Sequence, residues 1–302
     1  GAAFAIALLW AIHPLQVSTV LYVVQRMETL SLSFVLMALL CYLRGRENQI
    51  TGVRAWPWLL ACLPLVALGL LSKETAALFA AYTLALELTV LGFRARSASV
   101  ARTWRLGYLA AVLLAAVVFL LVVLPQYTPP EVYAVRNFSL AERLLTQLRV
   151  LPMYLGWILL PQPASFLFYY DNFPHSQGLL EPASTLAGAV FLTALAAAAL
   201  ALRRRMPLFA LGILWFFAAH LITSNVVPLE LVFEHRNYFA LLGVLLAVAD
   251  LFFRLPSDSD SRLRMLMVAL VLGGAFSLTL MRSAGWGNSL MLALELAAKS
   301  LA

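Results

Sequence analysis

The chain has 302 residues, of which 63% are hydrophobic and 12% charged, and its formal net charge at pH 7 is +7. Soluble domains are about 45–50% apolar and about 25% charged, so this composition excludes an ordinary soluble domain. It predicts an all-α bundle of transmembrane helices, because a helix satisfies its own backbone hydrogen bonds in lipid.

The apolar segments predict about nine membrane spans, since a bilayer core of about 30 Å needs about 20 apolar residues. The first span has no charged flank, which predicts the remainder of a helix from a longer protein rather than a signal peptide. We therefore expect a bundle over 1–282, followed at 283–302 by the start of a C-terminal helical region. The nine spans are 1–12, 28–43, 56–71, 75–93, 105–124, 184–202, 206–223, 238–253 and 265–281.

Arginines gather in four loops that lie on one side if the spans alternate, which predicts that this side is cytoplasmic. The net charge of +7 then follows from topology, and no basic–aromatic interleaving indicates a nucleic-acid partner. These arginines are Arg44, Arg46, Arg54, Arg94, Arg96, Arg102, Arg105, Arg203, Arg204, Arg205, Arg254, Arg262 and Arg264.

Two segments depart from the simple pattern of spans. Leu15–Leu43 is helical in pattern throughout and predicts a helix of about 43 Å, whose polar first half lies above the membrane or along its surface. Ser139–Leu160 carries Glu142, Arg143 and Pro152 and is too polar to span. It predicts an amphipathic or re-entrant helix on the outer face.

Five polar stretches fall on the face away from the cytoplasm, so function is expected there. The cytoplasmic loops are short, rich in arginine and otherwise bland. The five stretches are His13–Thr29, Ser72–Thr75, Gln126–Asn137, Pro161–Glu181 and Ser224–Tyr238.

The last of these stretches places Glu234, His235 and Arg236 in consecutive positions between two apolar segments. Arginine suits a phosphate through two parallel hydrogen bonds, and histidine can act as an acid, a base or a neutral donor. The glutamate can orient either group or ligate a metal. The alternative is a set of snorkelling anchors at a helix N-terminus, with Tyr238 in the interfacial belt. The residues alone favour neither interpretation.

Two further charged pairs each allow two interpretations. Lys73 and Glu74 lie in a tight turn, where they either cap the neighbouring helices or bring a lysine to a phosphate. Arg26 and Glu28 stand where a span begins, either as snorkelling side chains or as the wall of a groove for a lipid head group.

The stretch Pro161–Glu181 is aromatic and rich in proline, which predicts a loop or lid at the membrane surface. Asp171 and His175 lie four residues apart within it, and either can ligate a metal or transfer a proton. Two residues are a weak metal signal, so a divalent metal stays an open alternative without further support. Glu87 is the main charge within a span, and this scarcity disfavours a transporter or channel.

Three stretches resemble the membrane half of the transmembrane and tetratricopeptide-repeat (TMTC-like) glycosyltransferases of the GT-C class and their bacterial relatives. These are AIHPLQVSTVLYVVQRMETLSLSFVLMALLCYLRGR, LLSKETAALFAAY and SNVVPLELVFEHRNYFALLG, and together the likeness covers most of the chain. His235 stands where the animal proteins have other residues, which points to a bacterial branch. The motif positions are His13, Pro14, Tyr22, Arg26, Glu28, Ser72, Lys73, Glu74, Glu234, Arg236 and Tyr238.

This resemblance implies a GT-C bundle and a polyprenyl-phosphate-linked sugar as donor. It implies transfer to a protein or glycan acceptor on the periplasmic face of the bacterial inner membrane, and a tetratricopeptide-repeat domain that begins within 283–302. The phosphate would bind near Arg236 and Arg26, with Lys73 as a further candidate, while Glu234 and His235 orient the acceptor or the sugar. The family's acidic catalytic pair would lie upstream of residue 1.

Two other functions remain open from the sequence. One is a non-enzymatic membrane anchor or scaffold for downstream repeats, whose outer loops would tolerate alanine substitution. The other is a lipid or solute transporter, which would need a polar cavity in the middle of the bilayer. Convergence of Arg26, Lys73 and Arg236 in one groove would favour the enzyme over both.

Overall fold

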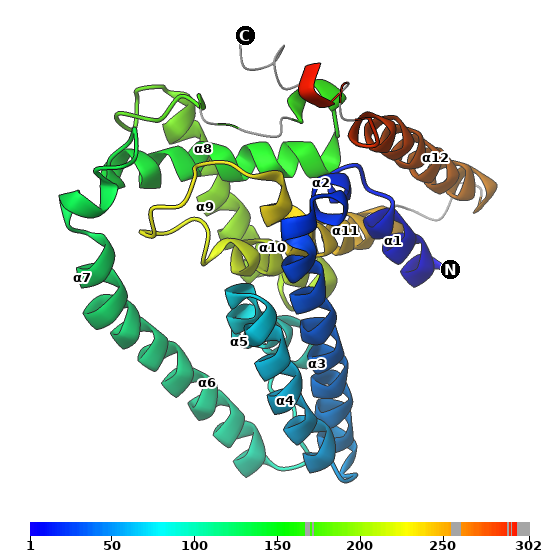
Figure 1. The fold of residues 1–302 in the computed structure, drawn as a ribbon. Coiled ribbons are helices and arrows are strands. Elements are labelled where there is room, and N and C mark those ends of the chain that lie inside the picture. Colours follow the sequence, from blue (N-terminus) through cyan, green and yellow to red (C-terminus); the bar gives the residue numbers. More distant parts are fainter. Residues whose placement is uncertain (167–169, 171, 255–260, 289, 291, 295–302) are drawn as a thin grey trace.

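The computed structural model describes residues 1–166, 170, 172–254, 261–288, 290 and 292–294. Over these residues every regular element is helical, which confirms the all-α prediction (Figure 1). The α-helices are α1 (Ala2–Ala11), α2 (Gln16–Leu21), α3 (Arg26–Thr51), α4 (Trp56–Ser72), α5 (Phe79–Leu86), α6 (Ala98–Val118), α7 (Leu124–Tyr127), α8 (Leu140–Leu159), α9 (Ser184–Leu202), α10 (Pro207–His220), α11 (Asn237–Phe253) and α12 (Ser261–Trp286). The short 3-10 turns include η1 (Val23–Gln25), η2 (Glu74–Leu78), η5 (Pro130–Tyr133), η6 (Pro163–Ser165) and η7 (Glu234–Arg236), and the π-helical turns are η3 (Glu87–Leu91) and η4 (Phe119–Val123).

Among the described residues, six helical segments are long and apolar enough to cross a membrane. Three shorter apolar helices, α1, α4 and α10, coincide with the other predicted spans, so nine crossings stay a prediction. Of the predicted C-terminal region, residues 289, 291 and 295–302 lie outside the described part of the chain. The six segments are Val23–Thr51, Glu74–Leu91, Ala98–Tyr127, Ser184–Leu202, Glu234–Phe253 and Arg262–Trp286.

Helices α10 and α11 pack closely because glycines face each other between them. A Cβ atom added to Gly212 would lie 2.2 Å from the Gly243 carbonyl oxygen. In lipid such close approach of backbones drives helix association, since the tails are as apolar as the side chains. The aromatic side chains of Tyr82 and Phe216 are fully buried where α5 and α10 meet.

The prediction of one continuous helix over Leu15–Leu43 is wrong. The helix is interrupted at Tyr22, which adopts an extended conformation with ψ 111°, so α2 and α3 are separate helices. The polar side chains of this segment, such as Gln16 and Glu28, are buried against the protein, and the place of the segment relative to a membrane stays a prediction. Helix α3 then continues to Thr51 and ends where Gly52 adopts a left-handed φ of 81°.

Arg46, predicted to lie in a cytoplasmic loop, is instead a fully buried residue of α3. Its Nε atom lies 2.5 Å from Oε1 of Glu87, and both side chains are 0% exposed. The guanidinium also stacks on Trp104, with its central carbon 4.5 Å from the ring centroid. The loop prediction failed because α3 extends about two turns beyond the apolar segment.

Helix α6 continues through the π-helical turn η4 into α7, and none of its residues is buried (Figure 1). It runs obliquely beside α3, α4 and α5 and includes the predicted span 105–124. Near its start the Nε1 atom of Trp104 donates to Oε1 of Gln49 at 2.6 Å. The hydroxyls of Tyr108 and Tyr42 meet at 2.9 Å in the same region. This end of the helix is thus tied to α3.

Helix α8 confirms that Ser139–Leu160 forms one helix. It begins with a capping box, in which the Ser139 hydroxyl accepts from the Glu142 amide and the Glu142 carboxylate accepts from the Ser139 amide. In Figure 1 the helix runs crosswise to α3 at one end of the bundle. Its buried face includes the polar side chains of Arg143 and Gln147, which donate to the loop before α11, and of Thr146, whose hydroxyl accepts from the Ser176 amide. Its place relative to a membrane stays a prediction.

Candidate functional site

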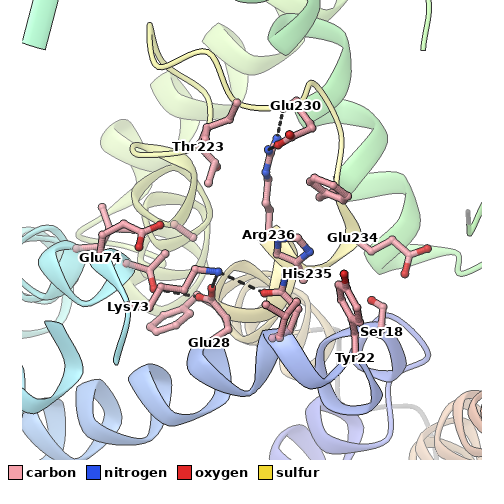
Figure 2. A pocket seen from close by; sticks show the side chains of 18 of the residues that line it. Ser18, Tyr22, Glu28, Lys73, Glu74, Thr223, Glu230, Glu234, His235 and Arg236 are labelled. Carbon is pink, nitrogen blue, oxygen red and sulfur yellow. Dashed lines mark hydrogen bonds and ion pairs between the residues drawn. The ribbon is translucent and has the colours of Figure 1, made fainter. Parts of the chain in front are cut away.

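A cavity of about 310 Å³ lies where the three sequence motifs meet (Figure 2). Its walls come from the α2–α3 region, the α4–η2 junction, the end of α10, and η7 with the loop before it. Six of the predicted site residues line it: Glu28, Lys73, Glu74, Glu234, His235 and Arg236. The structure therefore brings most of the predicted site together.

One wall holds a buried ion pair between Lys73 and Glu28. The Lys73 Nζ atom lies 2.5 Å from Oε2 of Glu28, and the two side chains are 13% and 5% exposed. Thr75 donates to the other carboxylate oxygen at 3.1 Å, and Lys73 also donates to Gln25 at 3.3 Å. Lys73 ends α4 in an extended conformation, which turns its side chain toward α3. The side chain therefore binds a partner across the cavity wall and caps neither neighbouring helix.

A second wall holds Arg236, which rises toward Glu230 in Figure 2. Its NH1 atom donates to the backbone oxygens of Glu230 and Leu231 at 2.7 and 3.2 Å. The Glu230 carboxylate accepts from Arg136 at 3.2 Å and lies 3.8 Å from Arg236. Burial acts to raise the pKa of Glu230, but hydrogen bonds and the charges of Arg136 and Arg236 outweigh it and lower the pKa. The Glu230 carboxylate is therefore held in its charged form.

Glu234 points away from the other labelled side chains in Figure 2 and binds Arg282 of α12. Its other carboxylate oxygen accepts from the hydroxyl of Tyr170 at 3.3 Å. Arg282 also donates to the backbone oxygen of Pro14 at 2.7 Å and so joins three distant segments. Sequence reasoning missed Arg282, although an arginine within an apolar helix signals a buried acidic partner.

His235 lies between the two cations of the site. Lys73 and Arg236 are each close enough to act on its ring electrostatically. The ring packs against Phe233 with a centroid separation of 4.9 Å. Within the described part of the chain, neither ring nitrogen has a hydrogen-bond partner. The imidazole is therefore available to a ligand in the cavity.

Three predicted site residues lie elsewhere, and a fourth is not among the described residues. Arg26 is exposed and does not line the cavity, because positions two apart on a helix do not share a face and Glu28 faces inward. Tyr238 packs α11 on α1, with its ring 5.2 Å from that of Trp10. His175 lies 3.3 Å from the Glu142 carboxylate at the start of α8. Asp171 lies outside the described residues.

Of the three cations whose convergence would favour an enzyme, Lys73 and Arg236 line one cavity and Arg26 does not. The site also gives no support to a metal. Among the described residues, no group of three or more His, Cys, Asp or Glu side chains is placed to hold an ion.

The loop that precedes Arg236 is held by Arg143 of α8, which sequence reasoning treated only as too polar for lipid. Its guanidinium donates to the backbone oxygens of Thr223 at 2.7 Å, Asn225 at 2.8 Å and Leu229. Burial, followed by repulsion from Arg236, lowers the pKa of Arg143 to about 10. Its partners lie more than 70 residues away and are backbone atoms, so no side-chain pattern could have revealed them.

Fold and site together define an all-helical chain with membrane-length helices and a charged cavity at their ends. Comparison with protein-family models, curated proteins and solved structures gave no significant match for this chain. The resemblance to the TMTC-like family therefore rests on the motif residues alone.

Proposed function

We propose that the chain is the membrane module of a GT-C-type glycosyltransferase. It transfers a sugar from a polyprenyl-phosphate-linked donor to a protein or glycan acceptor on the periplasmic face of a bacterial inner membrane. The observation that carries this proposal is the convergence of three distant motifs, through Glu28, Lys73 and Arg236, on one cavity. A scaffold for repeats would need no such convergence.

In this proposal Lys73 and Arg236 bind the phosphate of the donor. Sugar transfer leaves negative charge on that phosphate, and positioned cations stabilise such charge as it develops. Glu28 and Glu230 hold the two cations in place before the donor arrives, which limits the reorganisation needed during the reaction. His235, between the cations, orients the sugar or the acceptor.

The position of the cavity also favours an enzyme over a transporter. Lys73 follows the last residue of α4, and Arg236 precedes the first residue of α11. Charges at helix ends suit the head group of a lipid at the membrane surface, whereas a transport path needs ionisable groups within the bilayer. The buried pair of Arg46 and Glu87 is fully enclosed by protein and lines no such path.

The test uses the complete protein in native membranes supplied with a labelled polyprenyl-phosphate hexose. Arg236→Ala and Lys73→Ala should each lower the transfer of label by about 100-fold, as expected for loss of a charge-stabilising group. Arg44→Ala is the matched control, because Arg44 is an exposed cation paired with Glu47. Arg44→Ala should melt within a few degrees of the wild type, whereas Lys73→Ala leaves the buried carboxylate of Glu28 without its counter-charge and should melt lower, so transfer is measured below the melting range of every variant.

Normal transfer by Arg236→Ala would overturn the assignment. Equal tolerance of all three substitutions, in an otherwise active membrane, would support the scaffold instead.

A further inference from the structure

Two hydroxyl groups in the cavity wall have no hydrogen-bond partner among the described residues. One is the phenol of Tyr82 on α5, whose side chain is 0% exposed. The other is the Oγ1 atom of Thr223, which follows α10 and is also shielded by protein. Both residues line the cavity that holds Lys73 and Arg236. Buried polar groups almost always have partners, so two orphans in one cavity wall indicate a polar ligand.

The Tyr82 ring cannot turn away to find a partner elsewhere. It stacks on Trp215 with centroids 4.2 Å apart and on Phe239 with centroids 5.7 Å apart. Aromatic packing on two sides therefore fixes the position of the phenol oxygen. The Glu28 carboxylate, which lines the same cavity, is close enough to act on this phenol electrostatically.

The chemistry of this wall matches a ligand that carries hydroxyl groups. A tyrosine or threonine hydroxyl can both donate and accept, and a carboxylate accepts at each oxygen. A sugar hydroxyl likewise donates and accepts. The carboxylates of Glu230 and Glu234 are paired with Arg136 and Arg282, so those of Glu28 and Glu74 are the acidic groups that the lining offers to a sugar. An acidic sugar beside these carboxylates would be repelled, so the wall suits a neutral ring.

We propose that Tyr82, Thr223 and Glu28 form the subsite that binds the hydroxyl groups of a neutral sugar ring. This inference rests on the proposed function, because the ring is the one attached to the polyprenyl phosphate. The phosphate lies toward Lys73 and Arg236, and the ring lies against the two orphan hydroxyls. Ordered water is the competing occupant, since a water molecule can also satisfy two or more polar groups.

The experiment measures the affinity of the complete protein in nanodiscs for two lipids. One is a sugar-free polyprenyl phosphate and the other is the same lipid carrying a neutral hexose. Tyr82→Phe and Thr223→Val remove the hydroxyls while they keep the shape of the side chains. Each should weaken binding of the hexose lipid about fivefold, the effect of one neutral hydrogen bond, and leave the sugar-free lipid unaffected.

Tyr154→Phe is the matched control. Tyr154 is also 0% exposed, but its hydroxyl accepts a hydrogen bond from the Phe233 amide at 2.8 Å. Its loss should lower the melting temperature, and because the phenol also interacts with Arg236 it should act on both lipids alike and leave the ratio of the two affinities unchanged. Tyr82→Phe should leave the melting temperature equal or higher, because its hydroxyl has no partner in the described structure.

Unchanged affinity of both hydroxyl variants for the hexose lipid would mean that water alone occupies the subsite. That result overturns the inference while Arg236→Ala still tests the proposed function. A hexuronate-bearing lipid that binds as tightly as the hexose lipid would overturn the neutral assignment. If the wild-type protein binds neither lipid, the proposed function fails and the subsite fails with it.

Discussion

The loop from Thr223 to Glu230 receives four hydrogen bonds from one buried side chain, that of Arg143. We predict that Arg143→Met releases this loop and displaces Glu230 and Arg236 from the cavity wall. Methionine keeps most of the length of the side chain, so the substitution removes the hydrogen-bond donors with little change in packing. Any change in stability should therefore come from the lost hydrogen bonds and not from a packing cavity.

The loss of stability that we expect for Arg143→Met follows from the number of hydrogen bonds that the guanidinium donates. The guanidinium of Arg143 serves four backbone oxygens, which belong to Thr223, Asn225, Leu229 and Glu230. A buried carbonyl left without a partner costs about 1 kcal/mol or more, which gives about 4 kcal/mol for the set. Removal of a poorly hydrated charge, whose pKa burial lowers to about 10, offsets part of this cost. We expect the free energy of unfolding to fall by about 3 kcal/mol.

Thermal unfolding in nanodiscs and amide hydrogen exchange over residues 221–233 measure the two effects. Arg149→Met on the same helix is the control, because Arg149 is partly exposed and its main bond is to the Pro174 carbonyl at 2.8 Å. It should lower the free energy of unfolding by less than about 1 kcal/mol and leave exchange in the loop unchanged. Equal melting shifts and equal exchange in the two variants would refute the reasoning.

Two further predictions concern titration and a buried charge. Burial, aided by the charge of Arg282, lowers the pKa of His13 from 6.5 to about 4. The unfolded chain therefore gains a proton near pH 6.5 while the folded chain does not, and the free energy of unfolding falls by about 3 kcal/mol between pH 6.5 and 4. His13→Asn should remove its share of this slope in a pH series of melting curves, while a slope from His235 stays, because burial and the charges of Lys73 and Arg236 lower the pKa of that residue too. A slope that His13→Asn leaves unchanged would refute the contribution of His13. Glu87→Gln leaves the buried Arg46 without its counter-charge and should lower the free energy of unfolding by about 3–5 kcal/mol. Glu47→Gln breaks an exposed pair and should cost less than about 1 kcal/mol, so similar denaturation midpoints for these two variants would contradict the assignment.

The positions of helices could be predicted where the signal is local. Hydropathy placed a span at 184–202, and α9 occupies Ser184–Leu202. It failed over Leu15–Leu43, because the break at Tyr22 depends on where polar side chains find partners in the folded chain. It also failed at Arg46, since an arginine paired with Glu87 inside a helix looks the same in sequence as one in a loop.

The candidate site could be predicted through its unusual charges but not through its supports. Lys73 and Arg236 were identifiable because charges are scarce in an apolar chain. The hydroxyl of Tyr82 was not identifiable, because a tyrosine in an apolar segment is normally interpreted as a packing residue. Only the structure shows that its hydroxyl lacks a hydrogen-bond partner among the described residues. Arg282 and Arg143 were missed for a related reason, since their partners lie far away along the chain.

Helix α6 with its continuation through η4 and α7 is a segment of 30 residues, or about 45 Å in length. Its predicted span, 105–124, is about 30 Å long and matches a hydrocarbon core of about 30 Å, while the earlier turns that carry Arg102 extend beyond it. The start of the helix is bound to α3 through Trp104. Beyond its far end, Tyr133 donates to the Val226 carbonyl, which belongs to the loop that Arg143 also binds. With no buried residue between these ties, acyl chains would pack along both of its flanks, and membrane thickness would set its slope. The surrounding lipid then acts as a structural component of this protein, and its composition bears on the geometry of the loop above the cavity.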